Sequence, residues 1–273
     1  MAAVLGTNIA SIWASKNLQT AQSSMASSVE RLSSGLRINR GKDDAAGLAI
    51  ANTLTQQING ANQGIKNLND GVSIVQTADG ALAAVTEMAQ RLVTIGTQAA
   101  SGVLSTEQYA ALKTEADGLR TAMDNIVTRT KFSGTPLFGA EDPITISSSN
   151  ESGDTISIDI DALADFTSDA PDADVDLATI EDGQTLADKA GTFLVAISTQ
   201  RAALGSLQNQ LEFAINNVTD LSGNLTAARS RVIDTDYASE TASLTKGQIL
   251  QQAATAMLAQ ANQMPNVILS LLK

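Results

Sequence analysis

The feature that most constrains this fold is a run of apolar residues at alternating spacings of four and three. Between Leu54 and Val75 the pattern holds without a break, and after Asp79 it resumes at Leu82. A helix with this repeat carries a narrow apolar stripe that must be covered by another helix. A helix of about fifty residues is about 75 Å long, which few globular domains can contain. The sequence therefore predicts long helices that pair side by side.

A second long repeat occupies the C-terminal part of the chain. It runs from Leu186 to Val232, and Gln200 is its only polar member. In the N-terminal part, two three-residue spacings from Leu82 to Met88 form a stammer, which overwinds a coiled coil locally. Ser101-Gly102 is predicted to end the first long helix. Ser105 to Gln108 forms a capping box that begins the next helix, and the run Phe132 to Pro136 is predicted to end it.

The two chain ends each show a narrow apolar seam on an otherwise polar helix. A lone helix of this kind is marginal in water. Two arrangements satisfy the seams: pairing with each other in an antiparallel bundle within one chain, or ordering on self-assembly against other copies. Trp13, on the first helix, is predicted to be a packing anchor. The seam residues at both ends are Leu18, Met25, Val29, Leu32, Leu36, Leu250, Met257, Met264, Ile268 and Leu271.

The central part of the chain has a different composition. Between Glu141 and Asp182 there are 13 acidic residues and no Lys or Arg, so this block carries all of the net charge of -12. Ile144 to Ile146 and Ile156 to Ile160 alternate apolar and polar residues, which predicts a β-hairpin with a turn at 149–153. The predicted fold class is mainly α: a long antiparallel helical coiled-coil bundle formed by both chain ends, with a small β-containing central insertion.

Composition narrows the possible functions. The chain has no Cys and no His, which removes the commonest metal ligands and general bases, so we expect no enzyme, no metal and no cofactor. The acidic balance argues against nucleic-acid binding. No apolar run reaches the roughly 18 residues of a membrane helix, so no membrane insertion is expected. Asp172 to Asp176 resembles the start of an EF-hand, but Leu177 replaces the required Gly and Gly183 the required Glu.

Three other features bear on function class. No Lys or Arg precedes Lys16, so the N-terminus predicts no cleavable signal peptide. The protein then either stays inside the cell or leaves by a route that reads no such peptide.

A Ser–Lys dyad or the central carboxylates would be the remaining basis for catalysis. A monomeric coiled-coil adhesin is a further alternative, and it would be helical at both ends in dilute solution.

Several long motifs carry a family resemblance. Residues 32–39 read LSSGLRIN, and KDDAAGLAIA follows at 42–51. Further along are NDGVSIVQT, KFSG and DTDYA, and the last forty residues contain QILQQA, AMLAQANQ and LSLL. On these motifs the chain resembles bacterial flagellin over nearly its whole length. The resemblance gives no information on the acidic centre, where the family is hypervariable.

The resemblance implies a structural subunit that polymerises into the bacterial flagellar filament for motility. It places 1–42 and 235–273 in an inner core helical layer, 43–138 and 183–234 in an outer tube, and 139–182 in a variable acidic surface module. It implies secretion to the extracellular filament without a signal peptide. The partners it implies are further copies of the chain, the flagellar cap, hook–filament junction proteins, an export chaperone and the export apparatus. A hook–filament junction-type axial protein is the alternative.

One site also follows from the resemblance. Flagellins recognised by mammalian Toll-like receptor 5 carry contact residues on a helix patch. The corresponding stretch here includes Gln90, Arg91 and Ile95, with Glu115 on the following helix, and Arg91 and Glu115 match the family pattern. Ile95 stands where the family has Leu, and Thr94 replaces a charged residue. The resemblance therefore implies receptor recognition in a weakened form. The alternative is that Arg91 is a solvated or subunit-contacting arginine.

Overall fold

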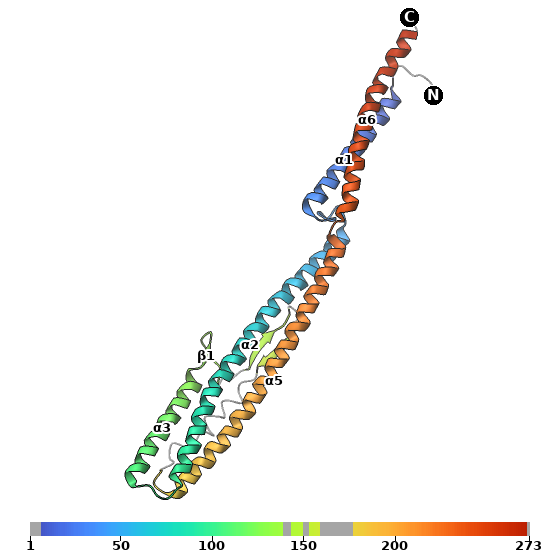
Figure 1. Ribbon diagram of the computed structural model, residues 1–273. Coiled ribbons are helices and arrows are strands. Elements are labelled where there is room, and N and C mark those ends of the chain that lie inside the picture. The colour runs from blue at the N-terminus through green and yellow to red at the C-terminus, as the bar shows by residue number, and fades with distance from the viewer. Residues whose placement is uncertain (1–6, 139–142, 150–152, 159–176, 272–273) are drawn as a thin grey trace. The chain divides into compact units, whose positions relative to one another are not determined.

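The computed structural model describes residues 7–138, 143–149, 153–158 and 177–271 (Figure 1). The chain divides into two compact units. The terminal unit comprises Met1–Gln56 and Asn224–Lys273, and the central unit comprises Gln57–Gly223. The elements are α1 (Ile9–Ser34), α2 (Ala45–Ala99), α3 (Thr106–Arg129), β1 (Lys131–Phe132), β2 (Thr135–Pro136), β3 (Ile144–Ser147), β4 (Thr155–Ile158), α5 (Ile180–Ile233) and α6 (Tyr237–Leu271).

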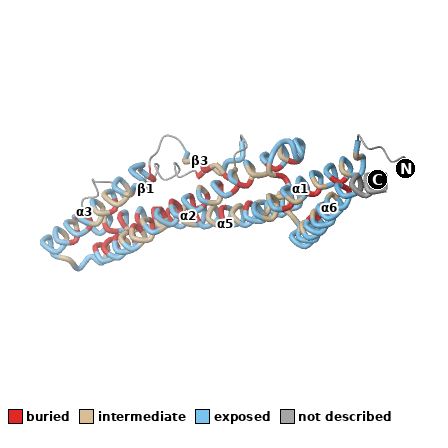
Figure 2. Tube along the Cα trace, turned by 90° about the horizontal axis from the view of Figure 1, so that it is seen from above, coloured by how far each residue is buried: buried red, intermediate tan, exposed pale blue. Residues whose placement is uncertain are grey.

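The central unit is a helical bundle whose core follows the predicted repeats. The α2 residues Leu68, Leu82 and Leu92 are almost fully buried, and so are Ile197 and Leu211 of α5. Figure 2 shows buried positions recurring along both helices. The third helix, α3, adds Leu112, Ala116 and Met123 to the same core. The predicted fold class is therefore confirmed. Leu221 is the exception within the second repeat, since 45% of it remains exposed.

Glycines allow the backbones of α2 and α5 to touch near one end of the bundle. A Cβ atom on Gly96 would lie 2.6 Å from the amide nitrogen of Ala187 and 2.8 Å from the carbonyl oxygen of Gly183. A Cβ on Gly183 would in turn lie 2.6 Å from the amide nitrogen of Ala100. Real Cβ atoms do not come this close to backbone. The two helices therefore require glycine at both positions of this crossing.

An ion pair occupies the point where the first repeat is interrupted. The Asp79 carboxylate of α2 accepts hydrogen bonds from Nε and Nη2 of Arg201 on α5, at 2.8 and 3.3 Å. This bond and the attraction of the carboxylate raise the pKa of Arg201. A partly exposed ion pair contributes little to the free energy of unfolding. Because it lies within an apolar seam, it specifies one register of the two helices.

Side-chain caps begin α3 and α5, as they do other helices. Ser105 Oγ accepts from the Gln108 amide, and the Ser105 amide donates to Gln108 Oε1, which confirms the predicted capping box. Thr179 and Asp182 form an equivalent pair before α5, with the Thr179 hydroxyl donating to the Asp182 carboxylate at 2.6 Å. That bond is the main reason why the pKa of Asp182 lies below its ordinary value. The cap is therefore present at neutral pH and weakens once the carboxylate protonates.

The predicted hairpin is present and packs on α2. Strands β3 and β4 pair antiparallel, with Ile144 opposite Ile158. Ile146 and Ile158 are buried, and both approach the position that a Cβ on Gly71 would take. Asn67 Nδ2 donates to the Ser147 carbonyl at 3.1 Å. The predicted extension to Ile160 and most of the acidic block lie outside the described residues.

A second hairpin was not predicted. After α3 ends at Arg129, β1 and β2 pair across a two-residue turn. Ser133 and Gly134 both have positive φ, at 51° and 89°, as a tight hairpin turn of this twist requires. The sequence pattern of this stretch predicts only the end of a helix.

We predict that Gly96→Ala lowers the free energy of unfolding by about 1–3 kcal/mol, because the added methyl group meets backbone that must move. Gly80→Ala is the matched control on the same helix, since nothing lies within 4 Å of its Cβ position. It should raise stability by up to about 1 kcal/mol through helix propensity. Thermal unfolding followed by circular dichroism measures both. Equal effects of the two substitutions would contradict a required glycine at the crossing.

Candidate functional site

The terminal unit is built on an antiparallel pair, α1 and α6 (Figure 1). Near one end of the pair, Asn8 Nδ2 donates to the Ala261 carbonyl at 2.7 Å. Near the other end, Arg31 lies 3.8 Å from the Glu240 carboxylate. Between them, the Cβ position of Gly247 is 3.4 Å from Cβ of Met25. The sum of the two residue numbers is nearly constant along these contacts, so one register holds along the pair.

Small residues make the closest contact between α1 and α6. The buried positions of α1 recur every seven residues, and those of α6 recur with the same period. Leu18, Met25 and Leu32 lie beside them and are half-buried. Small side chains let two helices approach closely, but they fill little of the space on either side. The buried small residues are Ala14, Ala21 and Ser28 on α1 and Gly247, Ala254 and Ala261 on α6.

This pairing uses part of the predicted seam, since Leu18, Met25 and Leu32 are half-buried beside the contact, and leaves other seam residues outside it. Val29 is 50% exposed, where the seam placed it in contact, and Ser28 is buried instead. Leu250 and Met257 are likewise exposed, at 48% and 61%, between the buried positions of α6. Leu36 is half-buried and pairs with Asp234 in an isolated β-bridge. The side chains of Met264, Ile268 and Leu271 lie outside those described. The largest apolar residues thus border the contact within the chain and do not form its centre.

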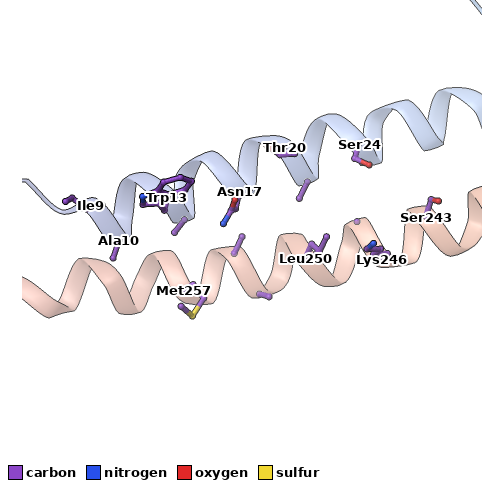
Figure 3. A pocket seen from close by; sticks show the side chains of 15 residues that line it. Ile9, Ala10, Trp13, Asn17, Thr20, Ser24, Ser243, Lys246, Leu250 and Met257 are labelled. Carbon is purple, nitrogen blue, oxygen red and sulfur yellow. The ribbon is translucent and has the colours of Figure 1, made fainter. Parts of the chain in front are cut away.

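The open side of the pair is an apolar groove of about 890 Å³. Its floor includes the small residues Ala14, Ala21 and Ala254. Trp13, which is 59% exposed, lies on the α1 wall, with Lys16 Nζ 5.5 Å from its ring centre. Figure 3 shows Trp13 and Asn17 on α1 and Leu250 and Met257 on α6 along the groove. The remaining lining residues are Ile9, Ala10, Thr20, Ser24, Ser243, Lys246, Gly247 and Ala253.

The walls of this groove repeat with the period of a coiled coil. On α1 the lining continues from Ala10 through Trp13, Asn17, Thr20 and Ser24, at spacings of three and four. The α6 wall runs from Ser243 to Met257 with the same spacings. Two neighbouring rows with this spacing leave gaps between their side chains. In a coiled coil, such gaps receive the side chains of a third helix. The groove therefore has the geometry of a helix-binding surface.

The predicted receptor patch lies on the central unit. Arg91 of α2 and Glu115 of α3 form an ion pair, with Nε and Nη2 of the arginine each 2.7 Å from the same carboxylate oxygen. This hydrogen bond and the carboxylate charge raise the pKa of Arg91. Gln90 is also exposed. Ile95 is fully buried in the core, so its assignment as a contact residue is corrected: it supports the patch from below.

Neither a metal-binding cluster nor a membrane-spanning helix is found among the described residues. Within the described ranges, no group of three or more acidic, His or Cys side chains is placed to hold a metal ion. No helix in that part of the chain is long and apolar enough to span a membrane. The EF-hand-like stretch 172–176 lies outside the described residues.

Comparison with known proteins decides the family. Residues 5–142 match the bacterial flagellin N-terminal helical region, and residues 187–272 match the bacterial flagellin C-terminal helical region. The chain belongs to the bacterial flagellin family. Accordingly, it is a structural subunit of the flagellar filament, and the junction-protein alternative is not favoured. Membership implies polymerisation of the chain with itself, and a place in the extracellular filament.

Individual flagellins align with this chain over nearly their whole length. The chain is 36% identical to a flagellin of Halalkalibacterium halodurans, covering 99% of this chain and 100% of the relative. It is 36% identical to the flagellin of Bacillus subtilis, covering 97% and 98%, and 30% identical to flagellin B of Vibrio cholerae, covering both completely. The crystal structure of Bacillus cereus flagellin superposes with a TM-score of 0.50 at 29% identity, covering 60% of this chain and 94% of that one.

We predict that Ala254→Asp and Met257→Asp separate pairing within the chain from the open groove. Ala254 is buried against α1, so a carboxylate there should weaken the α1–α6 pair by about 1–3 kcal/mol and lower the helix content of the monomer. Met257 is exposed, so its substitution should leave the monomer unchanged. Circular dichroism of dilute monomer measures both. A loss of helix in Met257→Asp equal to that in Ala254→Asp would contradict the assigned register.

Proposed function

We propose that the groove between α1 and α6 is a contact surface between subunits of the filament, occupied by a helix of a neighbouring copy. The support is the combination of an exposed apolar lining with the heptad spacing of both walls. The helices of the terminal unit carry the complementary repeat, so a second copy supplies a helix of the required kind. On this proposal, the predicted seam residues Leu250 and Met257 serve assembly.

The energetics favour covering this surface. Trp13, Leu250 and Met257 each expose about half of their surface or more in the single chain. Covering Leu250 and Met257 would contribute about 1 kcal/mol each, and Trp13 more, because its ring is larger. Asn17 and Lys246 also line the groove and are exposed in the single chain. A contact repeated at every subunit multiplies these contributions along a filament.

The test compares two substitutions on α6. Met257→Asp should raise the critical concentration for salt-induced polymerisation by about a hundredfold or more, because assembly would bury an unpaired carboxylate. Ala256→Asp is the matched control, since Ala256 is exposed but does not line the groove, and it should polymerise like the parent. Negative-stain electron microscopy and sedimentation measure filament formation.

The one tryptophan of the chain gives a second readout of that experiment. Trp13 lines the groove, so its emission should move to shorter wavelength as the parent polymerises, and acrylamide should quench it less. Unchanged Trp13 fluorescence in well-formed filaments, or parent-like assembly of Met257→Asp, would overturn the proposal.

We propose, second, that Arg91, Glu115 and Gln90 form the surface recognised by Toll-like receptor 5. The resemblance supplies the residues, and the ion pair supplies the specific observation: it joins α2 to α3 and holds both side chains at the exposed surface. Ile95 positions the patch from within the core and does not touch the receptor. Because Thr94 is uncharged, the surface offers fewer charged contacts than the family pattern.

Arg91→Ala should lower receptor signalling by monomeric protein about tenfold in reporter cells, since it removes an exposed charge with several hydrogen-bond donors. Glu107→Gln, an exposed change near the start of α3, is the control and should signal like the parent. Unchanged signalling by Arg91→Ala would show that this arginine only clamps α2 to α3 or contacts other subunits.

The resemblance supports four further elements of the proposed function. The chain would leave the cell through the flagellar export apparatus without a cleavable signal peptide, escorted by an export chaperone. It would meet the flagellar cap and the hook–filament junction proteins in the filament. Its role would be structural without catalysis, which agrees with a sequence lacking His and Cys. The layers at 1–42, 43–138, 139–182, 183–234 and 235–273 remain predictions.

A further inference from the structure

Helix α6 continues through a proline, which the interior of a helix normally does not tolerate. Pro265 has no amide hydrogen, so it cannot donate to the carbonyl of Ala261, four residues earlier in α6. The part of α6 that follows, 266–271, is less than two turns long, which is too short to form a helix of its own. The sequence rule for proline therefore predicts that α6 ends just before Pro265, yet α6 extends to Leu271.

The carbonyl that Pro265 leaves without its helical partner is paired from the other end of the chain. Asn8 Nδ2 donates to the Ala261 oxygen at 2.7 Å, across 253 positions of sequence. Ala261 is only 6% exposed, and an unpaired carbonyl at a buried position is destabilising. The Ser11 hydroxyl donates to Asn262 Oδ1 at 3.0 Å, which adds an exposed contact one residue further along α6. The side-chain amide of Asn8 therefore takes the place of the missing backbone donor.

The same side chain also caps the start of α1. Asn8 Oδ1 accepts a hydrogen bond from the Ser11 amide at 3.1 Å. The two contacts of Asn8 fix the orientation of its amide, since exchanging oxygen and nitrogen would oppose two donors at one contact and two acceptors at the other. Asp, Ser and Thr are also good caps, but among these residue types only Asn combines an acceptor with a separate donor group. The double role therefore accounts for an asparagine at this cap.

We propose that Asn8 is a positioning residue that makes the continuity of α6 depend on the start of α1. It caps one helix and supplies the donor that is missing from the other. Residues 266–271 are then helical only when α1 lies in register beside Ala261, so the two chain ends become ordered together. Asn8 does not line the groove between α1 and α6, so this inference holds or fails independently of the contact proposed there.

Hydrogen exchange at the end of α6 tests this dependence in a double-mutant cycle. Asn8→Ser keeps a good cap for α1 but removes the amide donor. It should speed exchange of the 266–271 amides about five- to tenfold, in whichever state (monomer or filament) the parent protects them, because the Ala261 carbonyl is left unpaired. Pro265→Ala restores a backbone donor for that carbonyl, so in this background Asn8→Ser should speed exchange less than about twofold.

Ser11→Ala is the matched control, because it removes another hydrogen bond between the same two helices and leaves the Ala261 carbonyl paired. It should speed exchange less than about twofold in either background. Unchanged exchange in the central unit shows that each variant is folded. Equal acceleration by Asn8→Ser in both backgrounds, or in neither, would leave Asn8 only a cap of α1, and the inference would be wrong. It would also be wrong if the parent protects none of the 266–271 amides in either state, because α6 would then end at the proline.

Discussion

Antiparallel pairing between the two halves of the chain is the interaction on which the rest of the structure depends. α1 lies along α6 in the terminal unit, and α2 packs against α5 in the central unit. None of these helices can bury its apolar stripe alone. The contacts join residues more than one hundred positions apart, such as Asp79 with Arg201 and Asn8 with Ala261. Each end of the chain is therefore needed to stabilise the other.

The α1–α6 and α2–α5 pairs share the four–three repeat, but the residues at its positions differ in size. In the central unit, large residues such as Leu82 and Leu211 fill the seam, and α3 and the β3–β4 hairpin cover what remains. In the terminal unit, Ala14, Ala21 and Ala254 occupy the seam, and Trp13, Leu250 and Met257 stay accessible. The choice of small or large residues at equivalent heptad positions thus decides whether a helix pair is closed or leaves a surface for another chain.

The sequence predicts the central unit, whose seam is filled, better than the α1–α6 pair, whose groove is open. Long repeats with large apolar residues indicated the seams of α2 and α5, and the capping box at Ser105 was predicted correctly, because both signals are local and strong. Part of the predicted seam of the ends, namely Val29, Leu250 and Met257, lies one position away from the buried residues, since a four–three repeat based on the largest residues can be offset by one position. A second repeat of small residues, through Ala14, Ala21 and Ser28, was the signal for the actual contact. The repeat through Leu92, Ile95 and Ala99 indicates that Ile95 faces the core, whereas the receptor motif taken alone treats it as a contact residue.

The most direct test of this account is the structure of the filament by electron cryo-microscopy at a resolution that shows side chains. We expect a helix from a neighbouring subunit to lie in the α1–α6 groove and contact Trp13, Leu250 and Met257, while the small-residue contact between α1 and α6 is kept. A groove that faces solvent in the filament, or one closed by rearrangement of its own two helices, would contradict it.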